Sequence, residues 1–359
     1  MNEEKRVVII GAGKTGRGFL ARLMKEAGRE IVFIEKNEEL IAKLREKISY
    51  EVHFFGNSSE KIIIDNYQIY HWKEKEVKEA LENAELIFVS VGGENLEEVG
   101  ERLKEILSRE KDAYIITAEN AANPAKRLEE SMGNKRVKVS ESTVFCTTIE
   151  KEGVHISSEN YPYLQYNVDL LEGKEFPITT LKAIHKFEDF LTRKLYTYNA
   201  ASCIIAYLGW KKGYTIYSEA ANDTEILRML DENYKLTNEV LCKAYGYDEK
   251  EQQEFALLSR AKFLDPTIVD TVERNARDPK RKVAEGERLL GPIKLLHEYG
   301  KDASVLEKTV AAALQYDHPK EAQWKLLLEE KGPEWILEEI CGLKKEDKIS
   351  KNIMKYYKE

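Results

Sequence analysis

The chain has 359 residues, of which 42% are hydrophobic, so it is long enough for two globular domains with complete cores. Its 64 acidic residues outnumber its 56 basic residues, and the net charge of −8 argues against nucleic acid or an anionic membrane as a partner. No apolar run approaches the roughly 20 residues that a membrane-spanning helix needs.

The chain starts with a predicted strand at residues 6–10, which leaves no room for a signal peptide before it. Its four cysteines are scattered, with no CxxC pair that would indicate a disulfide framework or a zinc site. Buried free thiols are typical of a reducing compartment. We therefore expect a cytoplasmic protein.

Strand and helix patterns alternate through the first half of the chain. Apolar, β-branched runs at 6–10, 30–35, 84–91, 112–118 and 135–145 are separated by helical patterns such as 17–28 and 38–48. A strand-rich insertion is expected at 54–72. Continuous apolar strands that alternate with helices predict a mostly parallel, doubly wound sheet covered on both faces, as in a Rossmann fold.

Strand patterns end near residue 187, and long helical patterns such as 218–246 and 302–317 follow. Gly173 and Pro177 interrupt the segment between the two halves. We expect a cofactor-binding Rossmann-like domain at 1–186 and an all-helical substrate domain at 187–359.

The first strand runs into "GAGKTGRGF", which contains G-x-G-x-x-G as Gly11, Gly13 and Gly16. The motif is weak alone, but here it follows a strand and opens a helix, which is the context of a dinucleotide-binding turn. A pyrophosphate would lie at the helix N-terminus, where free N–H groups favour an anion. The loop residues expected to bind the cofactor are Gly11, Ala12, Gly13, Lys14, Thr15, Gly16 and Arg17.

Glu35 ends the second strand, 24 residues after Gly11. A carboxylate at this place accepts hydrogen bonds from the adenosine ribose and repels a 2′-phosphate, which favours NAD over NADP. The adjacent Lys36 is a cation that would suit the 2′-phosphate. We expect NAD as the cofactor.

The helical pattern "RKLYTYNAASCIIAYLGWKKG" at 193–213 carries three polar residues among apolar ones. On an ideal helix, Asn199 lies roughly 140° and Ser202 roughly 80° from Lys194, so all three share one side. A lysine removed from water loses proton affinity and can act as an acid or base near neutral pH. The alternative is a lysine that reaches back to solvent and an amide that caps local backbone.

The same segment resembles the K-x-x-x-x-N-x-x-H signature of the polyol-specific long-chain dehydrogenases. "GAGKTGRGF" and "TAENAANPAKRL" also resemble segments of that family. A third match is "RAKFLDPTIVDTVERNARDPKRKVAEGERLLGP", which follows the family's D-T-V-x-R-x-x-R-D-P-x-R-K-L and E-R-L-x-G-P blocks. The resemblance covers most of the chain and is strongest for members that act on mannitol 1-phosphate.

The resemblance implies roles for particular residues. Lys194 would be the general acid and base, and Asn199 and Asn120 would hold the reacting oxygen. Ser202 stands where the family has histidine, so a substrate contact is expected there without a group that titrates near neutral pH. The stretch 142–153 also lacks the family's V-D-R-I run.

A basic run follows Asp278-Pro279, a pair that is typical of a helix start. Cations in a first helical turn oppose the helix dipole unless an anion binds there. We expect either a pocket for a substrate phosphate or an ordinary solvated basic run. The residues concerned are Arg274, Arg277, Lys280, Arg281 and Lys282.

The function expected is NAD-dependent interconversion of a polyol or its phosphate and a ketose or its phosphate, with mannitol 1-phosphate and fructose 6-phosphate as the leading pair. No metal is expected, because the six histidines show no metal-ligand spacing. Two alternatives stay open: a reductase of another ketose or a uronate, and an NAD-binding sensor without turnover. The sequence leaves the oligomeric state open.

Overall fold

The computed structural model describes residues 6–107, 112–121 and 123–359, apart from the side chains of 57–59. Contacts between Cα atoms divide the chain into two compact units, Met1–Phe187 and Glu188–Glu359. Each unit is described separately below.

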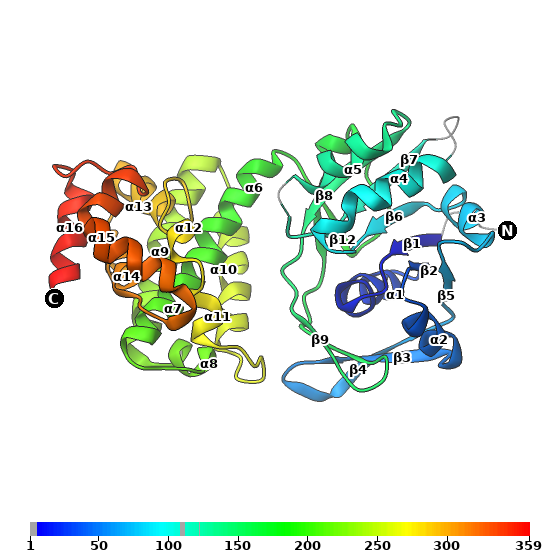
Figure 1. The fold of residues 1–359 in the computed structure, drawn as a ribbon, viewed down its shortest axis with the longest axis horizontal. Coiled ribbons are helices and arrows are strands. Elements are labelled where there is room, and N and C mark those ends of the chain that lie inside the picture. The colour runs from blue at the N-terminus through cyan, green and yellow to red at the C-terminus, as the bar shows by residue number, and fades with distance from the viewer. Residues whose placement is uncertain (1–5, 108–111, 122) are drawn as a thin grey trace. The chain divides into compact units, whose positions relative to one another are not determined.

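The first unit is built on a sheet that has eight strands in the described residues, in the order β12-β11-β8-β7-β6-β1-β2-β5 (Figure 1). Neighbouring strands are parallel except for β11 and β8, which are antiparallel. The strands are β1 (Arg6–Ile10), β2 (Glu30–Glu35), β5 (Gln68–His71), β6 (Leu86–Val89), β7 (Ala113–Thr117), β8 (Val137–Thr143), β11 (Leu164–Asn167) and β12 (Leu181–Ile184).

Helices cover both faces of this sheet, as expected for parallel strands. Alternate residues of β1 point to opposite faces, and Val7, Val8, Ile9 and Ile10 are all fully buried. One face packs against α3 (Glu76–Glu82), α4 (Leu96–Ile106) and α5 (Pro124–Met132). The other packs against the helix formed by η2 (Gly16–Leu20) and α1 (Ala21–Glu26), while α2 (Glu38–Glu46) lies beside β5.

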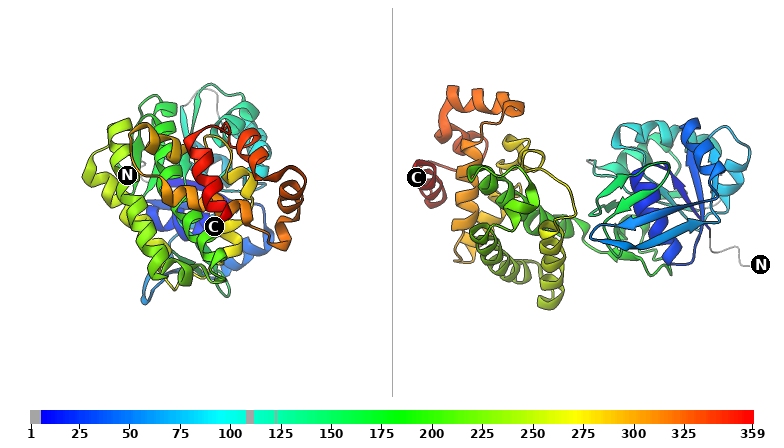
Figure 2. Two further views of the ribbon diagram at one scale, coloured as in Figure 1. Left: turned by 90° about the vertical axis from the view of Figure 1, so that its left-hand side faces the viewer. Right: turned by 90° about the horizontal axis from the view of Figure 1, so that it is seen from below.

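A second, smaller sheet of the first unit has the strand order β4-β3-β10-β9 and packs against η2 and α1 (Figure 2). It combines β3 (Ser49–Phe54) and β4 (Asn57–Asp65) with β9 (Thr148–Glu150) and β10 (Ile156–Ser158). The predicted strand-rich insertion is therefore divided between two sheets, because β5 extends the main one.

The second unit is helical. Its elements in the described residues are α6 (Phe187–Lys194), η5 (Leu195–Asn199), α7 (Ala200–Lys211), α8 (Tyr217–Ala221), α9 (Thr224–Tyr245), α10 (Glu249–Leu264), α11 (Val272–Ala276), α12 (Pro279–Lys282), α13 (Leu290–Glu298), α14 (Ser304–Gln315), η6 (Pro319–Glu321), α15 (Ala322–Glu339) and α16 (Lys348–Lys358). Helix α7 is mostly apolar and buried and contacts α8, α9, α11 and α14, so it forms the centre of this core.

The predicted fold class, a mostly parallel Rossmann-like sheet followed by an all-helical part, is confirmed. The helix expected over 218–246 is divided in two. Asp223 caps the start of α9 by accepting hydrogen bonds from Glu225 N and Ile226 N, each 3.0 Å long.

Candidate active site

The turn after β1 has the backbone that the glycine motif predicts. Gly11 has a φ of +97°, and a Cβ there would lie 2.1 Å from the carbonyl oxygen of Ser90, just after β6. A Cβ on Gly13 would meet no protein atom within 4 Å. The turn is therefore tightly packed on its protein side and open on the other, which is the shape a bound phosphate requires.

Glu35 holds this turn from the end of β2. Its carboxylate accepts hydrogen bonds from Ala12 N at 2.7 Å, Lys36 N at 2.8 Å and Asn37 N at 3.0 Å. The Lys36 ammonium donates to Asn95 Oδ1 at 2.8 Å and forms an ion pair with Glu98 at 3.5 Å. The acid is thus fixed beside the turn, and the neighbouring cation is bound by other groups.

A cavity of about 500 Å³ extends over this edge of the sheet, beyond the carboxyl ends of β1, β2, β6 and β7. Five predicted cofactor residues line it: Gly11, Gly13, Lys14, Thr15 and Glu35. The cavity is also lined by Leu40, Trp72, Val99 and Arg102, with the Arg102 guanidinium 5.5 Å from the Trp72 ring centroid. Sequence reasoning missed these four residues, because they come from separate helices and a loop with no motif in common.

Arg17 requires a correction. Its side chain is 1% exposed and does not line the cavity. Its guanidinium donates to the carbonyl oxygens of Ala12 at 2.6 Å and Val154 at 2.7 Å, and it forms an ion pair with Glu150. Arg17 therefore supports the turn from behind, and the neighbouring Ala12 and Gly16 are likewise absent from the cavity lining.

Glu119 and Asn120 follow β7 and also line the cavity. Glu119 accepts hydrogen bonds from Val91 N at 2.5 Å and Gly92 N at 2.8 Å, and burial raises its pKa. Asn120 is exposed and lines the cavity, as expected for a polar residue at the end of a parallel strand. Sequence reasoning selected Asn120 and missed Glu119 beside it.

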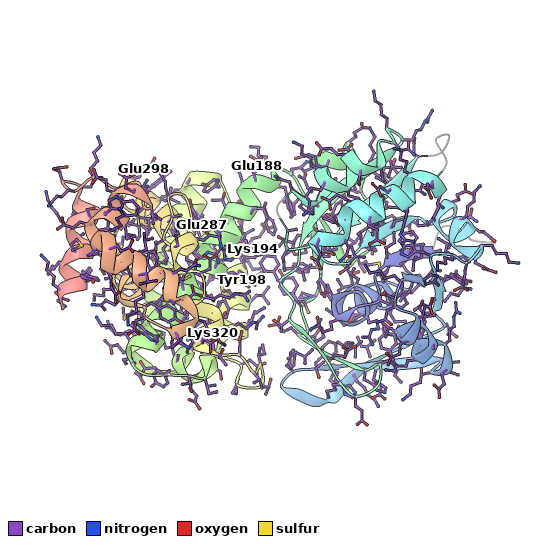
Figure 3. All side chains as sticks on the ribbon, viewed as in Figure 1. Glu188, Lys194, Tyr198, Glu287, Glu298 and Lys320 are labelled. Carbon is purple, nitrogen blue, oxygen red and sulfur yellow. The ribbon has the colours of Figure 1, made fainter. Side chains whose placement is uncertain are left out.

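In the second unit, an irregular helical turn runs from Leu195 to Asn199, directly after Lys194. Figure 3 labels Lys194 and Tyr198 in this segment. Residues 195–199 form a π-turn in which Ala200 N donates to Leu195 O, five residues back. Such a turn accommodates one extra residue between regular helices and is often found at functional sites. If that residue is left out of the count, Asn199 lies about 40° and Ser202 about 20° from Lys194. The π-turn thus reduces the angle around the helix axis that separates the three polar residues, compared with the regular helix assumed above.

Lys194 has the electrostatic character of an acid–base residue. It is partly buried, and burial lowers its pKa to about 8. The positive charges of Lys262 on α10 and Arg288 just before α13 make smaller contributions to this lowered pKa. The amine is therefore divided between its charged and neutral forms near neutral pH.

Ser202 lies near Asn275 and Lys282. The Ser202 hydroxyl is 3.4 Å from Asn275 Oδ1, and the Lys282 ammonium donates to the carbonyl oxygen of Asn275. Lys282 is 5% exposed, its Nζ lies 5.7 Å from the Tyr207 ring centroid, and burial lowers its pKa. Asn275, which sequence reasoning missed, thus contacts both Ser202 on α7 and Lys282.

The five predicted phosphate-binding cations do not converge on one point. Arg274 pairs with Asp270 at 3.0 Å, Arg281 pairs with Asp278 at 2.5 Å, and Lys282 points inward. Arg277 and Lys280 are exposed. The expected cap is wrong: Asp278 has a φ of +57° and makes no side-chain cap, because its carboxylate binds Arg281.

Arg288 is a further residue that sequence reasoning missed. Its charge lowers the pKa of both Lys194 and Lys282, and its Nε lies 3.1 Å from Glu287 Oε2. It belongs to the "ERLLGP" block, so the signal was present in the sequence, but no spacing rule connected it to Lys194. Arg288 thus acts electrostatically on both Lys194 and Lys282.

Within 6–107, 112–121 and 123–359, no group of three or more His, Cys, Asp or Glu side chains could hold a metal ion. In that same part of the chain, no helix is both long and apolar enough to cross a membrane.

Comparison with known families gives two matches. The family described as "Mannitol dehydrogenase Rossmann domain" matches residues 5–148, and "Mannitol dehydrogenase C-terminal domain" matches residues 186–357. Together the two matches leave out only residues 1–4, 149–185 and 358–359. They fall on the two structural units described above.

Individual proteins show the same relationship. The chain is 29% identical to mannitol-1-phosphate 5-dehydrogenase of Bacillus subtilis over 96% of this chain and 98% of that protein. It is 28% identical to the Podospora anserina protein of the same name, over 97% of this chain and 95% of that protein.

Two solved structures share the fold. D-sorbitol dehydrogenase has a TM-score of 0.77 at 12% identity and covers 99% of this chain and 93% of its own. Pseudomonas fluorescens mannitol 2-dehydrogenase, solved with NAD and D-mannitol, has a TM-score of 0.66 at 11% identity and covers 99% and 92%.

Proposed function

Because the chain belongs to the mannitol dehydrogenase family, we propose that it is an NAD-dependent oxidoreductase that interconverts a polyol phosphate and a ketose phosphate. The pair proposed is mannitol 1-phosphate and fructose 6-phosphate, since the relatives at 28–29% identity are mannitol-1-phosphate 5-dehydrogenases.

The residues of the first unit fit NAD. The open surface at Gly13 leaves room for a pyrophosphate, and the first turn of the following helix supplies N–H groups without intrahelical partners. The fixed carboxylate of Glu35 can accept ribose hydroxyls, and it disfavours the 2′-phosphate of NADP. When bound, the nicotinamide accepts or supplies the hydride.

Lys194 is proposed to move the proton. Its neutral amine would take the hydroxyl proton of the polyol as hydride leaves the carbinol carbon, and its ammonium would return a proton to the ketone oxygen in the reverse direction. The support is a pKa of about 8, which keeps both forms populated near neutral pH.

Asn199 and Asn120 are proposed to hold the oxygen whose charge changes. An amide N–H that is already in place stabilises a developing alkoxide without further reorganisation. Asn199 follows Lys194 on one face of its helix, and Asn120 lines the cofactor cavity. Ser202 is proposed to donate a hydrogen bond to a substrate hydroxyl, and it cannot carry charge near neutral pH.

Arg277 and Lys280 are the proposed phosphate contacts, because they are exposed while the other three cations of the segment bind protein acceptors. Because three of the five cations bind protein acceptors, a second candidate is a dehydrogenase of an unphosphorylated polyol. In that case these three cations would stabilise the fold and would not bind substrate. A comparison of fructose with fructose 6-phosphate separates the two, since equal kcat/KM for both would reject phosphate recognition.

The observation that carries the proposal is the placement of Lys194, with its lowered pKa, directly before the π-turn that ends at Asn199, in a chain of this family. The test is oxidation of NADH by fructose 6-phosphate, followed by absorbance, with Lys194→Ala beside it. Lys211→Ala, at the exposed end of α7, is the matched control. Lys194→Ala should lose at least about 100-fold in kcat. Undiminished turnover would remove the proposed mechanism, and NADH binding without turnover of any ketose by the wild type would favour a sensor.

A further inference from the structure

We propose that Gln252 is a positioning residue for the catalytic helix, holding the π-turn that aligns Lys194 with Asn199. The inference rests on the proposed function, since it assigns to Gln252 the geometry that the proton transfer uses. Gln252 lies on α10, 58 residues after Lys194 in the sequence, and no motif singles it out.

The Gln252 side chain is fully buried, with 0% exposure, and its amide is bound on both sides. Oε1 accepts a hydrogen bond from Arg193 Nε at 2.6 Å. Nε2 donates to Thr197 Oγ1 at 3.2 Å and to Asn238 Oδ1 at 2.8 Å. One amide on α10 therefore connects the residue before Lys194 to a residue inside the π-turn, and α9 fixes that amide.

Arg193 is itself held in place. Its guanidinium lies 4.5 Å from the ring centroids of both Tyr247 and Phe255, and the residue is 9% exposed. Cation–π contacts to buried rings of this kind are stronger than those on the surface. The hydrogen bond from Arg193 to Gln252 thus starts from a rigid donor, which matters because it lies next to Lys194 in the chain.

The other side of the π-turn packs against α10 as well. The Tyr198 ring lies 5.0 Å from that of Phe255 and 6.3 Å from that of Phe263. These contacts bury the turn but set no hydrogen-bond geometry. Gln252 supplies that geometry, since it binds Thr197 at the third position of the turn.

A π-turn needs such support, because an isolated helix prefers the regular i to i−4 pattern. If the turn relaxed to a regular helix without losing a residue, Asn199 would rotate by about 100° relative to Lys194. The two groups would no longer address one substrate oxygen. Lys194 would also change its distance from Lys262 on α10 and from Arg288, the two charged groups that, after burial, lower its pKa. Arg193 is the charged residue next to it on its own helix.

The experiment compares Thr197→Val and Gln252→Leu with Ser259→Ala in the full-length protein. Thr197→Val removes only the acceptor of the Gln252 amide and keeps the shape of the side chain. Ser259→Ala is the matched control: Ser259 is fully buried and bonds Tyr234 at 2.7 Å, so it also joins α9 and α10, but by a different bond. Thermal unfolding and circular dichroism establish whether each variant folds. If Gln252→Leu does not fold, Thr197→Val alone tests the inference.

The first readout is the pH dependence of Lys194 acylation, measured by mass spectrometry after trace labelling with acetic anhydride. The labelling midpoint of the wild type is expected near pH 8. We expect it to rise by about one pH unit in Thr197→Val and Gln252→Leu, and to remain unchanged in Ser259→Ala. The second is kinetic: kcat should fall about tenfold while the NADH dissociation constant stays unchanged.

An unchanged labelling midpoint in folded Thr197→Val would overturn the inference, as would an equal shift in Ser259→Ala. The labelling needs no turnover. Absence of turnover in the wild type would therefore reject the proposed function, while the labelling midpoints would still test the role of Gln252.

Discussion

Gly16 faces Gly11 so closely that a Cβ on Gly16 would lie 2.0 Å from the carbonyl oxygen of Gly11. The contact is backbone against backbone, so neither side can rotate away. It connects the first turn of the cofactor helix to the end of β1 and keeps the motif compact.

Two alanine substitutions in this motif should therefore have opposite signatures. Gly16→Ala should destabilise the fold by about 3 kcal/mol, because the added methyl group has nowhere to go. Gly13→Ala should leave stability nearly unchanged, since no protein atom lies within 4 Å of its Cβ, and should weaken NADH binding instead. Thermal unfolding and NADH fluorescence titration measure the two effects. Equal stability losses would contradict the assignment of Gly13 to the open side.

Replacing Glu35 should change which cofactor binds. In Glu35→Gln, the NADH dissociation constant should rise about tenfold, because a charged acceptor of hydrogen bonds is lost. Discrimination against NADPH should fall, since the repulsion of the 2′-phosphate disappears. Glu38→Gln, on the exposed first turn of α2, is the control. A Glu35 variant with the wild-type ratio of NADH to NADPH affinity would disprove the role.

Arg17 should matter through Ala12 and the small sheet, although it does not line the cavity. Arg17→Met leaves Glu150 and two carbonyl groups without their donor, so we expect a loss of about 3 kcal/mol in stability. Arg17→Lys should recover part of it, and weaker NADH binding should accompany both changes. If folded Arg17→Lys bound NADH as tightly as the wild type, the support for the turn would come from elsewhere.

The pH profile should differ between the two directions of the reaction. Lys194 has its pKa lowered to about 8, so its neutral form increases as pH rises through that value. Oxidation of the polyol uses the neutral amine, and kcat/KM should rise to a plateau above pH 8. Reduction of the ketose uses the ammonium, and kcat/KM should fall above pH 8. Initial rates in both directions between pH 6 and 10 test this, and parallel profiles would exclude Lys194 as the proton carrier.

The architecture was predictable because its signals are local. Apolar strands that alternate with amphipathic helices predicted the main sheet, and the glycine motif and Glu35 predicted the cofactor edge. Strands β9 to β12 were missed because they are three or four residues long and carry no apolar run. The division of 54–72 between two sheets depends on the pairing of β4 with β3 and of β5 with β2, partners that the pattern does not specify.

The site was less predictable where tertiary contacts determine the position of a side chain. Arg17 follows the glycines, so the motif suggested a phosphate contact, but Glu150 and Val154 bind it from 133 and 137 residues away. The spacing of Lys194, Asn199 and Ser202 was read on a regular helix. Lys194 and Asn199 are five residues apart, and Asn199 and Ser202 are three apart. These spacings fit one helix face better if one extra residue is inserted, and this was the sequence signal for the π-turn.

Burying the amine of Lys194 also has a consequence for the folded state itself. The unfolded chain holds its proton up to the ordinary lysine value of 10.5, while the folded chain releases it near 8. Between these two pH values the unfolded chain binds more protons, so on this account stability rises with pH in that interval. Below it, the native protein carries the full penalty of an ammonium withdrawn from water. The residue proposed for chemistry is thus one that the fold would be more stable without.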